Sequence, residues 1–267
     1  MAASDLTIFL GQFAPGVDSL ENLQTIRELA IQAVHEGADV LVCPEYAQAF
    51  APQPGPEWAL LAQPLDGHFV TELAEISAQA SGVIIIAGML VGQGDKPRNT
   101  MVAIGPAGVM AVSEKIHLYD AFGQQESQWV TRGDLTPPQL LTLGEHRIGM
   151  MACYDLRFPE VARRLVDAGA TCMVVPAQWV PGPQKIEHWS TLLRARAIEN
   201  QCFVVGCGQP EPYGVGRSMV VDPLGDVIVE LDGQESVGVA DLGVGLVDAT
   251  RAANPMTNAR RWGITAL

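Results

Sequence analysis

Three reactive side chains each follow a strand-like run of apolar residues. Glu45, Lys115 and Cys153 stand at the ends of such runs, and Cys153 comes directly after residues 148–152. Because ligands collect at strand ends in α/β sheets, these side chains could converge on one pocket. A carboxylate, an amine and a thiol in one pocket would supply a base, a charge stabiliser and a nucleophile for attack on an acyl carbon.

The local context of Cys153 favours a reactive thiol. It lies in MACYDLRFPE, where a tight turn would join the strand to a helix that begins near Pro159, because proline suits the first helical turn. Backbone N–H groups and the positive helix end are expected to lower the pKa of this thiol and to hold an oxyanion. The other cysteines lie in or beside apolar runs and are expected to be packing residues: Cys43, Cys172, Cys202 and Cys207.

Taken singly, each of these side chains has a plainer interpretation. A glutamate or a lysine is usually on the surface, and a lone cysteine is more often a small buried apolar group than a nucleophile. A Cys–His thiol hydrolase with His117 or His188 as its base is an alternative, and so is a binding protein without turnover. The five histidines show no metal-ligand spacing, and the sequence contains neither a P-loop nor a complete dinucleotide-binding loop, so no metal or organic cofactor is expected.

Four motifs occur in a characteristic order along the chain. They are CPEYA with Glu45, SEKIHLYD with Lys115, QQES with Glu126 and GMMACYDLRFPE with Cys153. In these motifs, and in the downstream segments HWSTLLRARAIEN and GRSMVVDPLGDVI, the chain resembles the nitrilase, or carbon–nitrogen hydrolase, superfamily over nearly its whole length.

This resemblance implies a catalytic set of Glu45, Lys115, Cys153 and a second glutamate, Glu126. In the implied reaction Cys153 attacks an amide carbonyl after Glu45 takes its proton, ammonia leaves, and water activated by Glu45 releases the acid from the thioester. Lys115 and the backbone N–H of Tyr154 would hold the oxyanion, and Glu126 would hold Lys115 in place.

The continuation after the cysteine bears on the substrate. CYDLRFPE resembles the amidase branch that includes omega-amidase and deaminated-glutathione amidase, which favours the amide of a small carboxylic acid over a nitrile or an N-carbamoyl compound. Arg157 is expected either to pair with a substrate carboxylate or to form an internal salt bridge. Trp179 is expected to line the pocket, or to serve the core or a dimer. Arg217 departs from the small residue or histidine of many relatives, so the particular amide stays open.

Strand-like and helix-like segments alternate along the chain and must position these residues. This alternation, with hairpins mixed in, predicts one α/β domain over residues 1–267 with mixed sheets buried on both faces. The resemblance implies a four-layer αββα sandwich that pairs into an αββα–αββα dimer. The expected strands cover residues 6–13, 40–43, 83–87, 99–104, 109–112, 140–143, 148–152, 172–175, 202–206, 219–221, 227–230 and 237–240, and the helical faces span 20–34, 69–80, 161–168 and 186–197.

The composition restricts the partners and the compartment. The 267 residues are 48% apolar and 17% charged, and the net charge of −14 disfavours nucleic acids and anionic lipid surfaces. No apolar run approaches the about 18 residues that span a bilayer, and the N-terminus shows no export signal. We therefore expect a cytoplasmic protein that acts on a small-molecule amide, and the resemblance adds a homodimer or higher homo-oligomer.

Overall fold

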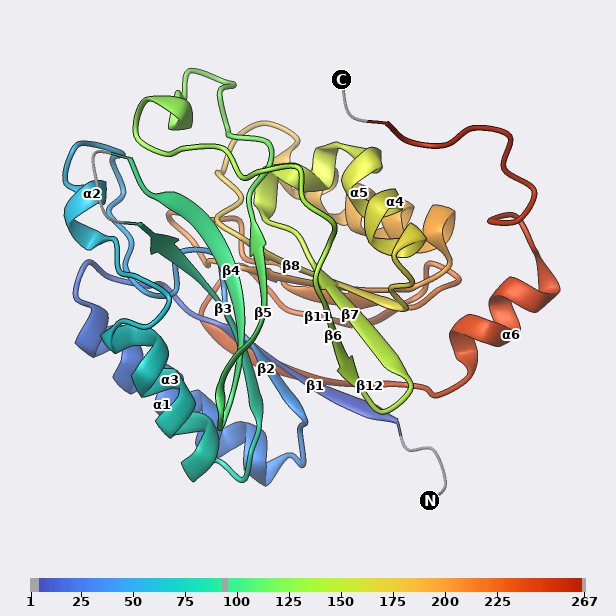
Figure 1. Cartoon of the computed structure of the whole chain (residues 1–267), viewed down its shortest axis with the longest axis horizontal. Helices are drawn as coiled ribbons and strands as arrows, with labels where there is room; N and C mark the ends of the chain where they lie inside the picture. The colour runs from blue at the N-terminus through green and yellow to red at the C-terminus, as the bar shows by residue number, and fades with distance from the viewer. Residues whose placement is uncertain (1–4, 93–95, 266–267) are drawn as a thin grey trace.

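Two six-stranded sheets form the centre of the molecule in the computed structural model, which describes residues 5–92 and 96–265 (Figure 1). The first sheet contains β1 (Leu6–Gln12), β2 (Val40–Val42), β3 (Ile84–Val91), β4 (Arg98–Gly105), β5 (Gly108–Glu114) and β12 (Ser236–Leu242). The second contains β6 (Leu140–Leu143), β7 (His146–Met150), β8 (Cys172–Ala177), β9 (Phe203–Gly208), β10 (Met219–Val221) and β11 (Val227–Glu230). The helices are α1 (Ser19–His35), α2 (Trp58–Leu61), α3 (His68–Gln79), α4 (Pro159–Asp167), α5 (Lys185–Asn200) and α6 (Leu246–Ala253), and short 3₁₀ helices cover Glu126–Gln128 and Cys153–Arg157.

Both sheets are mixed and follow the same plan. The strand orders are β12-β1-β2-β3-β4-β5 and β11-β10-β9-β8-β7-β6. In the first sheet β1, β2 and β3 are parallel, and in the second β7, β8 and β9 are parallel; antiparallel strands flank both sets. The carboxyl ends of β2 and β7 therefore lead into the segments that carry Glu45 and Cys153.

Alternating side chains on each strand separate the molecule into four layers. Ile8 and Leu10 on β1 belong to the core between the two sheets, whereas Phe9 between them packs beneath the outer helices α1 and α3. On β8, Val174 points into the same central core and Met173 belongs to the layer under α4 and α5. Figure 1 shows these two helix pairs on the outer faces of the two sheets. The predicted αββα sandwich with mixed sheets is confirmed.

Local signals for the helix ends also hold in the structure. The side chain of Asp18 accepts a hydrogen bond of 2.8 Å from the backbone N–H of Leu20 and caps α1. Pro159 is the first residue of α4, where its missing N–H costs nothing. The sequence did not predict α2, α6 or the two 3₁₀ helices, because elements this short carry little periodicity.

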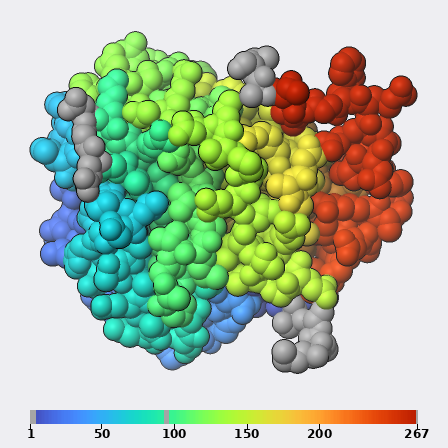
Figure 2. All heavy atoms as spheres, in the orientation of Figure 1, coloured from blue at the N-terminus to red at the C-terminus, as the bar shows by residue number. Residues whose placement is uncertain are grey.

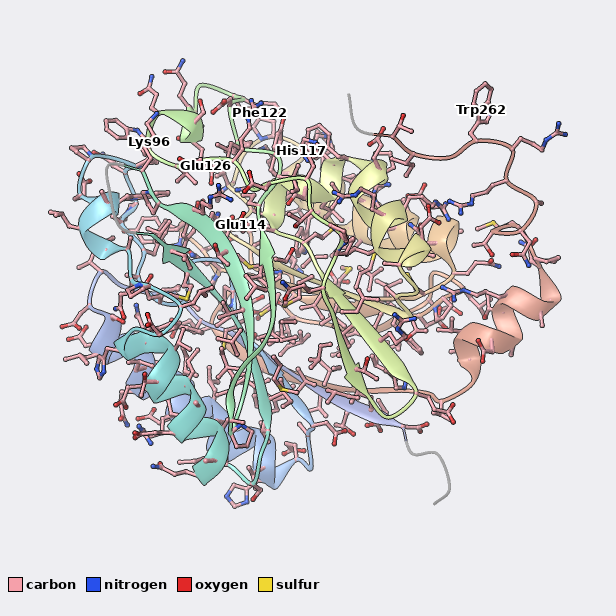
Figure 3. The ribbon with its side chains drawn as sticks, viewed as in Figure 1. Lys96, Glu114, His117, Phe122, Glu126 and Trp262 are labelled. Carbon is pink, nitrogen blue, oxygen red and sulfur yellow. The ribbon has the colours of Figure 1, made fainter. Side chains whose placement is uncertain are left out.

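The described chain ends in an extended segment beyond α6. This segment runs along the side of the molecule, and its Trp262 is 89% exposed (Figures 2 and 3). Among residues 5–92 and 96–265, none of the helices has the length and apolar character needed to cross a membrane. The structure contains one chain, so pairing into a dimer stays a prediction.

Candidate active site

Glu45 follows β2 and is only 1% exposed, but polar groups surround its carboxylate. Its Oε1 accepts hydrogen bonds from Lys115 Nζ at 2.9 Å and from Asn99 Nδ2 at 2.7 Å. Its Oε2 accepts the backbone N–H of Gln178 at 2.7 Å. These donors hold the side chain in place, and a carboxylate held in this way can take a proton from a nucleophile.

Lys115 lies between two carboxylates. Its Nζ is 2.9 Å from Glu45 Oε1 and 2.9 Å from Glu126 Oε2, and its side chain is 3% exposed. Burial favours the neutral amine, but the negative charges of Glu126 and Glu45 outweigh it and raise the pKa of Lys115 well above its ordinary value. Lys115 is therefore a fixed positive charge at neutral pH.

Glu126 is the second carboxylate that binds the Lys115 ammonium group. It begins the 3₁₀ helix in the connection after β5, a connection that also carries His117 and Phe122 (Figure 3). Its carboxylate accepts hydrogen bonds from the Tyr46 hydroxyl at 2.7 Å and from the backbone N–H of Tyr119 at 2.6 Å. Burial acts to raise the pKa of Glu126, but the charge of Lys115 and these hydrogen bonds lower it below its usual value.

Cys153 lies just beyond β7 on a strained backbone. Its φ is +40°, which is unusual for a residue other than glycine, and its side chain is buried. The Sγ atom is 3.5 Å from the carbonyl oxygen of Gln178, the residue whose N–H binds Glu45. The backbone of Gln178 therefore contacts both the carboxylate and the thiol.

The prediction that this turn lowers the thiol pKa is wrong. Burial raises the pKa of Cys153 well above its ordinary value, and the charge of Glu45 raises it further, against a lowering by Lys115. The 3₁₀ helix Cys153–Arg157 also separates the sulfur from the N-terminus of α4. The resting thiol is consequently neutral and requires a base before it can attack.

Asp155 joins the turn of Cys153 to the turn of Lys115. It is 1% exposed, and its carboxylate accepts backbone N–H groups of Ile116 at 3.3 Å, His117 at 2.9 Å and Ala152 at 3.4 Å. Its Oδ1 is also 2.8 Å from His117 Nδ1. The two chain segments are thus fixed to each other through one buried carboxylate.

The four candidate catalytic side chains meet in one cavity of about 190 Å³. Aromatic side chains form much of its wall, and Tyr46 and Tyr213 each pack against Phe50. The side chains that line it include Glu45, Lys115, Glu126, Cys153, Tyr46, Phe50, Trp58, Tyr119, Gln178 and Tyr213. A small polar molecule that enters would meet the thiol, the lysine and both carboxylates together.

The predicted substrate-binding residues lie in a narrow recess on another side of Cys153. Tyr154, Arg157 and Trp179 line it with Lys185. Cζ of Arg157 is 4.7 Å from the centre of the Trp179 ring, and Nη2 of Arg157 is 3.3 Å from His188 Nδ1. Within the described residues, no carboxylate lies within 4.0 Å of the Arg157 guanidinium.

The alternative of a Cys–His thiol hydrolase finds no support in this geometry. His117 contacts Asp155 and stacks on Phe158 with ring centres 3.6 Å apart, and His188 contacts Arg157. Neither histidine is among the residues that line the cavity or the recess. Residues 5–92 and 96–265 also contain no group of three or more histidine, cysteine, aspartate and glutamate side chains that could hold a metal ion.

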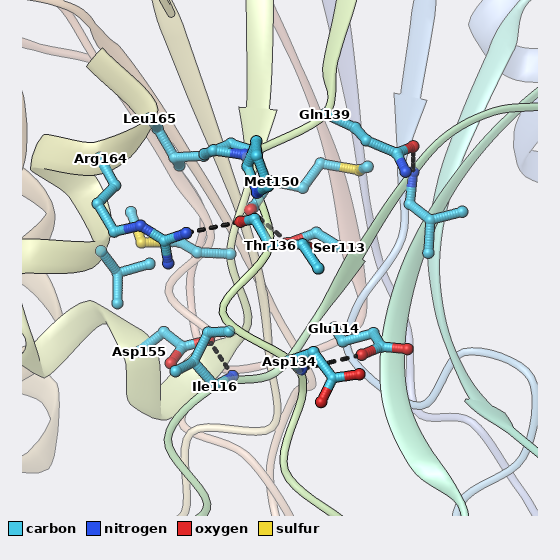
Figure 4. Close-up of a pocket in the computed structure, with 15 residues that line it drawn as sticks. Ser113, Glu114, Ile116, Asp134, Thr136, Gln139, Met150, Asp155, Arg164 and Leu165 are labelled. Atoms are coloured by element: carbon cyan, nitrogen blue, oxygen red, sulfur yellow. Dashed lines mark hydrogen bonds between the residues drawn. The ribbon is translucent and has the colours of Figure 1, made fainter. Parts of the chain in front are cut away.

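A second cavity of about 210 Å³ lies beside β5 and α4 (Figure 4). Its polar groups bind one another: Ser113 Oγ donates to the Met150 carbonyl at 2.8 Å, and Arg164 Nη2 donates to the Thr136 carbonyl at 2.6 Å. None of the four candidate catalytic residues lines it. We therefore place the chemistry in the cavity of Cys153.

Several polar residues of the site carried no recognised sequence signal. Asn99, Tyr46 and Gln178 contact the two glutamates, and Lys185 faces the recess although it begins a helix, where a lysine is usually exposed. Gly88 has a steric role, which the lack of a side chain on glycine could have suggested. A Cβ there would lie 2.6 Å from the backbone N of Tyr46 and 2.8 Å from Cα of Glu45.

Comparison with known proteins agrees with this fold. A family model described as carbon–nitrogen hydrolase matches residues 8–252, and the chain belongs to that family. It is 36% identical over 264 residues to a Mycobacterium tuberculosis protein named as a hydrolase, with 92% of each chain covered. It is 34% identical over 257 residues to the deaminated glutathione amidase of Escherichia coli O157:H7, with 96% of this chain and 98% of that protein covered.

The solved structures show the same fold. A carbon–nitrogen hydrolase superfamily protein from Xanthomonas campestris, which carries an arsenic adduct in its active site, superposes with a TM-score of 0.86. It is 26% identical, and the match covers 98% of this chain and 99% of that chain. The family and the enzyme class expected from the motifs are thereby confirmed.

Proposed function

We propose that this enzyme is an amidase that hydrolyses the amide of a small carboxylic acid to the acid and ammonia through a thioester on Cys153. The observation that carries the proposal is the single cavity in which the Cys153 thiol meets the Glu45 carboxylate, with the Lys115 ammonium group bound to both Glu45 and Glu126. The similarity to a deaminated glutathione amidase supports an amide as the substrate.

Acylation begins with transfer of the Cys153 proton to Glu45. The sulfur then bonds to the amide carbon, and the carbonyl oxygen becomes an oxyanion that Lys115 Nζ and the backbone N–H of Tyr154 stabilise. The tetrahedral intermediate collapses as Glu45 returns its proton to the departing nitrogen. The carbon–nitrogen bond breaks, ammonia leaves, and a thioester remains.

Deacylation repeats these steps with water as the nucleophile. Glu45 takes a proton from water, and the resulting hydroxide bonds to the thioester carbon. The second tetrahedral intermediate loses the sulfur, which regains a proton from Glu45, and the carboxylic acid leaves. Glu126 positions Lys115 in both halves of the reaction, because it binds the same ammonium group as Glu45 does.

In this proposal Arg157 and Trp179 contribute to substrate binding. The guanidinium has no carboxylate partner among the described residues, and the ring of Trp179 holds it beside Cys153. An anionic end of the substrate would supply the missing partner, because a guanidinium matches a carboxylate in geometry and charge. Residues 1–267 as a single domain, the homodimer and the cytoplasmic location remain predictions from the sequence.

The decisive experiment measures ammonia release from succinamate and butyramide by the whole chain and by the Cys153→Ala variant. We expect turnover by the wild type, none by the variant, and an acyl adduct on Cys153 of the wild type in intact-protein mass spectra. Cys202→Ala is the matched control, because that thiol is also buried but lies outside the cavity, in the core beneath the outer helices.

Two results would overturn the proposal. Ammonia release that survives in Cys153→Ala would exclude this thiol as the nucleophile. Turnover of a nitrile or an N-carbamoyl amino acid, with no turnover of either amide, would assign the chain to another activity of the same superfamily. Equal loss of activity in the Cys202→Ala control would show that the assay reports on folding and not on the nucleophile.

A further inference from the structure

Asn99 contacts three of the four candidate catalytic residues, although the proposed reaction gives it no role. It lies near the start of β4 and is 1% exposed. Its Nδ2 donates a hydrogen bond of 2.7 Å to Glu45 Oε1 and a longer one of 3.3 Å to Glu126 Oε1. Its backbone carbonyl accepts the N–H of Lys115 at 2.8 Å. One residue therefore links both carboxylates to the segment that carries the lysine.

The orientation of the Asn99 amide is unfavourable for stability. Its Oδ1 is buried and has no hydrogen-bond partner among residues 5–92 and 96–265. A buried acceptor without a partner destabilises the folded state, so its presence requires an explanation. Turning the amide over would not help, because Oδ1 would then face the oxygens of Glu45 and Glu126, and an ionised carboxylate donates no hydrogen bond. The two carboxylates therefore set the orientation of this side chain.

The ammonium group of Lys115 has three N–H donors, and the contacts around it decide how they are used. One reaches Glu45 Oε1 at 2.9 Å, and another reaches Glu126, whose two oxygens lie 2.9 and 3.1 Å away. The proposed reaction needs the third for the oxyanion. A carboxylate oxygen has two lone pairs, and Asn99 binds the one on Glu45 Oε1 that Lys115 leaves. Asn99 thus satisfies this oxygen and leaves Lys115 a donor for the substrate.

The neutral charge of Asn99 serves the same purpose. A lysine or an arginine at this position would bring a second cation to the two carboxylates and would compete with Lys115 for them. With an amide there, Lys115 is the one cation within 4.0 Å of Glu45 or Glu126 in the described part of the chain. The position of the ammonium group therefore depends on two carboxylates that Asn99 joins to each other.

We propose that Asn99 is a positioning residue that joins Glu45 to Glu126 and thereby directs the free N–H of Lys115 toward the oxyanion. The inference rests on the proposed amidase function and adds a residue to its machinery. Asn99 does not line the cavity, so it acts through these three side chains and not through contact with the substrate. Its contribution should consequently appear in the transition state and not in the binding of the intact amide.

The test separates transition-state stabilisation from substrate binding. Asn99→Leu keeps the approximate size of the side chain and removes both of its polar groups, while the backbone contact to Lys115 remains. We expect kcat/KM for butyramide to fall by about 10- to 100-fold, the usual effect of losing a hydrogen bond to a charged group. Binding of butyramide to Cys153→Ala, measured by calorimetry, should change by less than about threefold when Asn99→Leu is added, because the intact amide has no oxyanion.

Butyraldehyde supplies a mimic of the tetrahedral intermediate. Its carbonyl carbon bonds to Sγ of Cys153, and the thiol proton passes through Glu45 to the carbonyl oxygen, which gives a hemithioacetal. The inhibition constant of butyraldehyde should rise in Asn99→Leu by about the same 10- to 100-fold factor as kcat/KM falls. Asn99→Ala removes the same polar groups without an added apolar branch and should give the same result, so the outcome does not depend on how the leucine packs.

Asn200→Leu is the matched control. Asn200 is also buried, its Nδ2 donates to the Arg196 carbonyl at 2.9 Å, and its Oδ1 likewise lacks a partner within the described chain. It is the last residue of α5 and lines neither the cavity nor the recess. This variant should leave kcat/KM and the inhibition constant of butyraldehyde unchanged, whatever its effect on stability.

Equal weakening of butyraldehyde and butyramide binding in Asn99→Leu would overturn the inference, because Asn99 would then only support the structure. Unchanged kinetics would overturn it as well. Butyraldehyde also separates this failure from failure of the proposed function, since the hemithioacetal forms without hydrolysis. An affinity for the aldehyde that depends on Asn99 supports the positioning role even if no amide is turned over. An affinity that does not depend on Asn99 contradicts that role even if the wild type is an active amidase.

Discussion

The Nζ atom of Lys115 lies 2.9 Å from Oε1 of Glu45 and engages this oxygen together with Asn99. Oε2 of the same carboxylate accepts one hydrogen bond from the described residues, the one that the backbone N–H of Gln178 donates. A carboxylate oxygen has two lone pairs, so Oε2 keeps one of them for the proton of a nucleophile. The lysine thus binds one oxygen of the base and leaves the other oxygen free to act.

The Glu45→Gln variant tests whether the carboxylate is the base for Cys153. The amide keeps the shape of the side chain but accepts no proton at neutral pH, so amide hydrolysis should fall by about 10²- to 10⁴-fold. The pKa of Cys153 should fall in the same variant, because the charge of Glu45 raises it after burial does. The ultraviolet absorbance of the thiolate, recorded against Cys153→Ala, measures this midpoint.

These two readouts should move in opposite directions. Activity decreases while the fraction of thiolate at a given pH increases, a combination that general loss of structure does not produce. If the midpoint rises or stays constant in Glu45→Gln, the carboxylate does not act on the thiol as we describe.

The Glu126→Gln variant tests the charge that positions Lys115. Burial opposes ionisation, but Lys115 and the hydrogen bonds from Tyr119 and Tyr46 lower the pKa of Glu126, so its ionised form stabilises the native state. This stabilisation is complete above the unfolded pKa of about 4.3 and disappears as pH falls through the lower folded value. The wild type should therefore exceed the variant in stability by about 1–3 kcal/mol at neutral pH.

Thermal unfolding from pH 7 downward checks this sign. The difference in Tm between wild type and Glu126→Gln should be largest at neutral pH and should shrink once the pH drops below the unfolded pKa. A difference that is constant with pH would show that the ionisation of Glu126 does not contribute to stability.

The sequence predicted individual strands and the residues that meet at the site, but not the order of the strands in either sheet. The consecutive apolar residues Ile8, Phe9 and Leu10 indicated a strand, and its two faces bury different layers, as a sheet between two cores requires. The motifs around Glu45 and Cys153 identified side chains that the fold then places in one cavity. In both cases short stretches of chain carry the information.

Contacts between distant segments were not predictable in this way. Gln178 lies 133 positions after Glu45 in the sequence, and its backbone N–H binds the Glu45 carboxylate. Because every residue except proline carries such an N–H, the residue type does not predict this contact. The burial of Lys185 depends on Tyr119 and Phe122 from another loop. The raised pKa of Cys153 was missed because burial is a property of the packed molecule, whereas the expected turn and helix were local.

The Asp155→Asn variant tests the link between the turns of Lys115 and Cys153. One carboxylate accepts N–H groups from both turns, and an amide must turn its own NH₂ group toward at least one of these donors. We expect a loss of about 1–3 kcal/mol in the free energy of unfolding, measured in urea. The kcat should fall by about tenfold or more in folded protein, since small misplacements of reacting groups are costly.

Asp134→Asn is the matched control, because Asp134 is an exposed aspartate with an ion pair to Arg98. It should leave both quantities near their wild-type values. If Asp155→Asn loses stability but keeps its kcat, Asp155 is a structural residue only and does not position the catalytic groups.

The Gly88→Ala variant tests how closely β3 must approach the turn of Glu45. The added Cβ would lie 2.6 Å from the backbone N of Tyr46 and 2.8 Å from Cα of Glu45, and backbone atoms cannot rotate away as a side chain can. The turn must therefore shift, which moves the carboxylate relative to Lys115 and Cys153. A displacement on this scale should reduce kcat/KM by about 10²-fold. Gly243→Ala provides the comparison, because its Cβ would meet nothing within 4 Å and activity should be unchanged. Wild-type kinetics in Gly88→Ala would mean that the Glu45 turn tolerates displacement, and the precise placement of the base would then not limit the reaction.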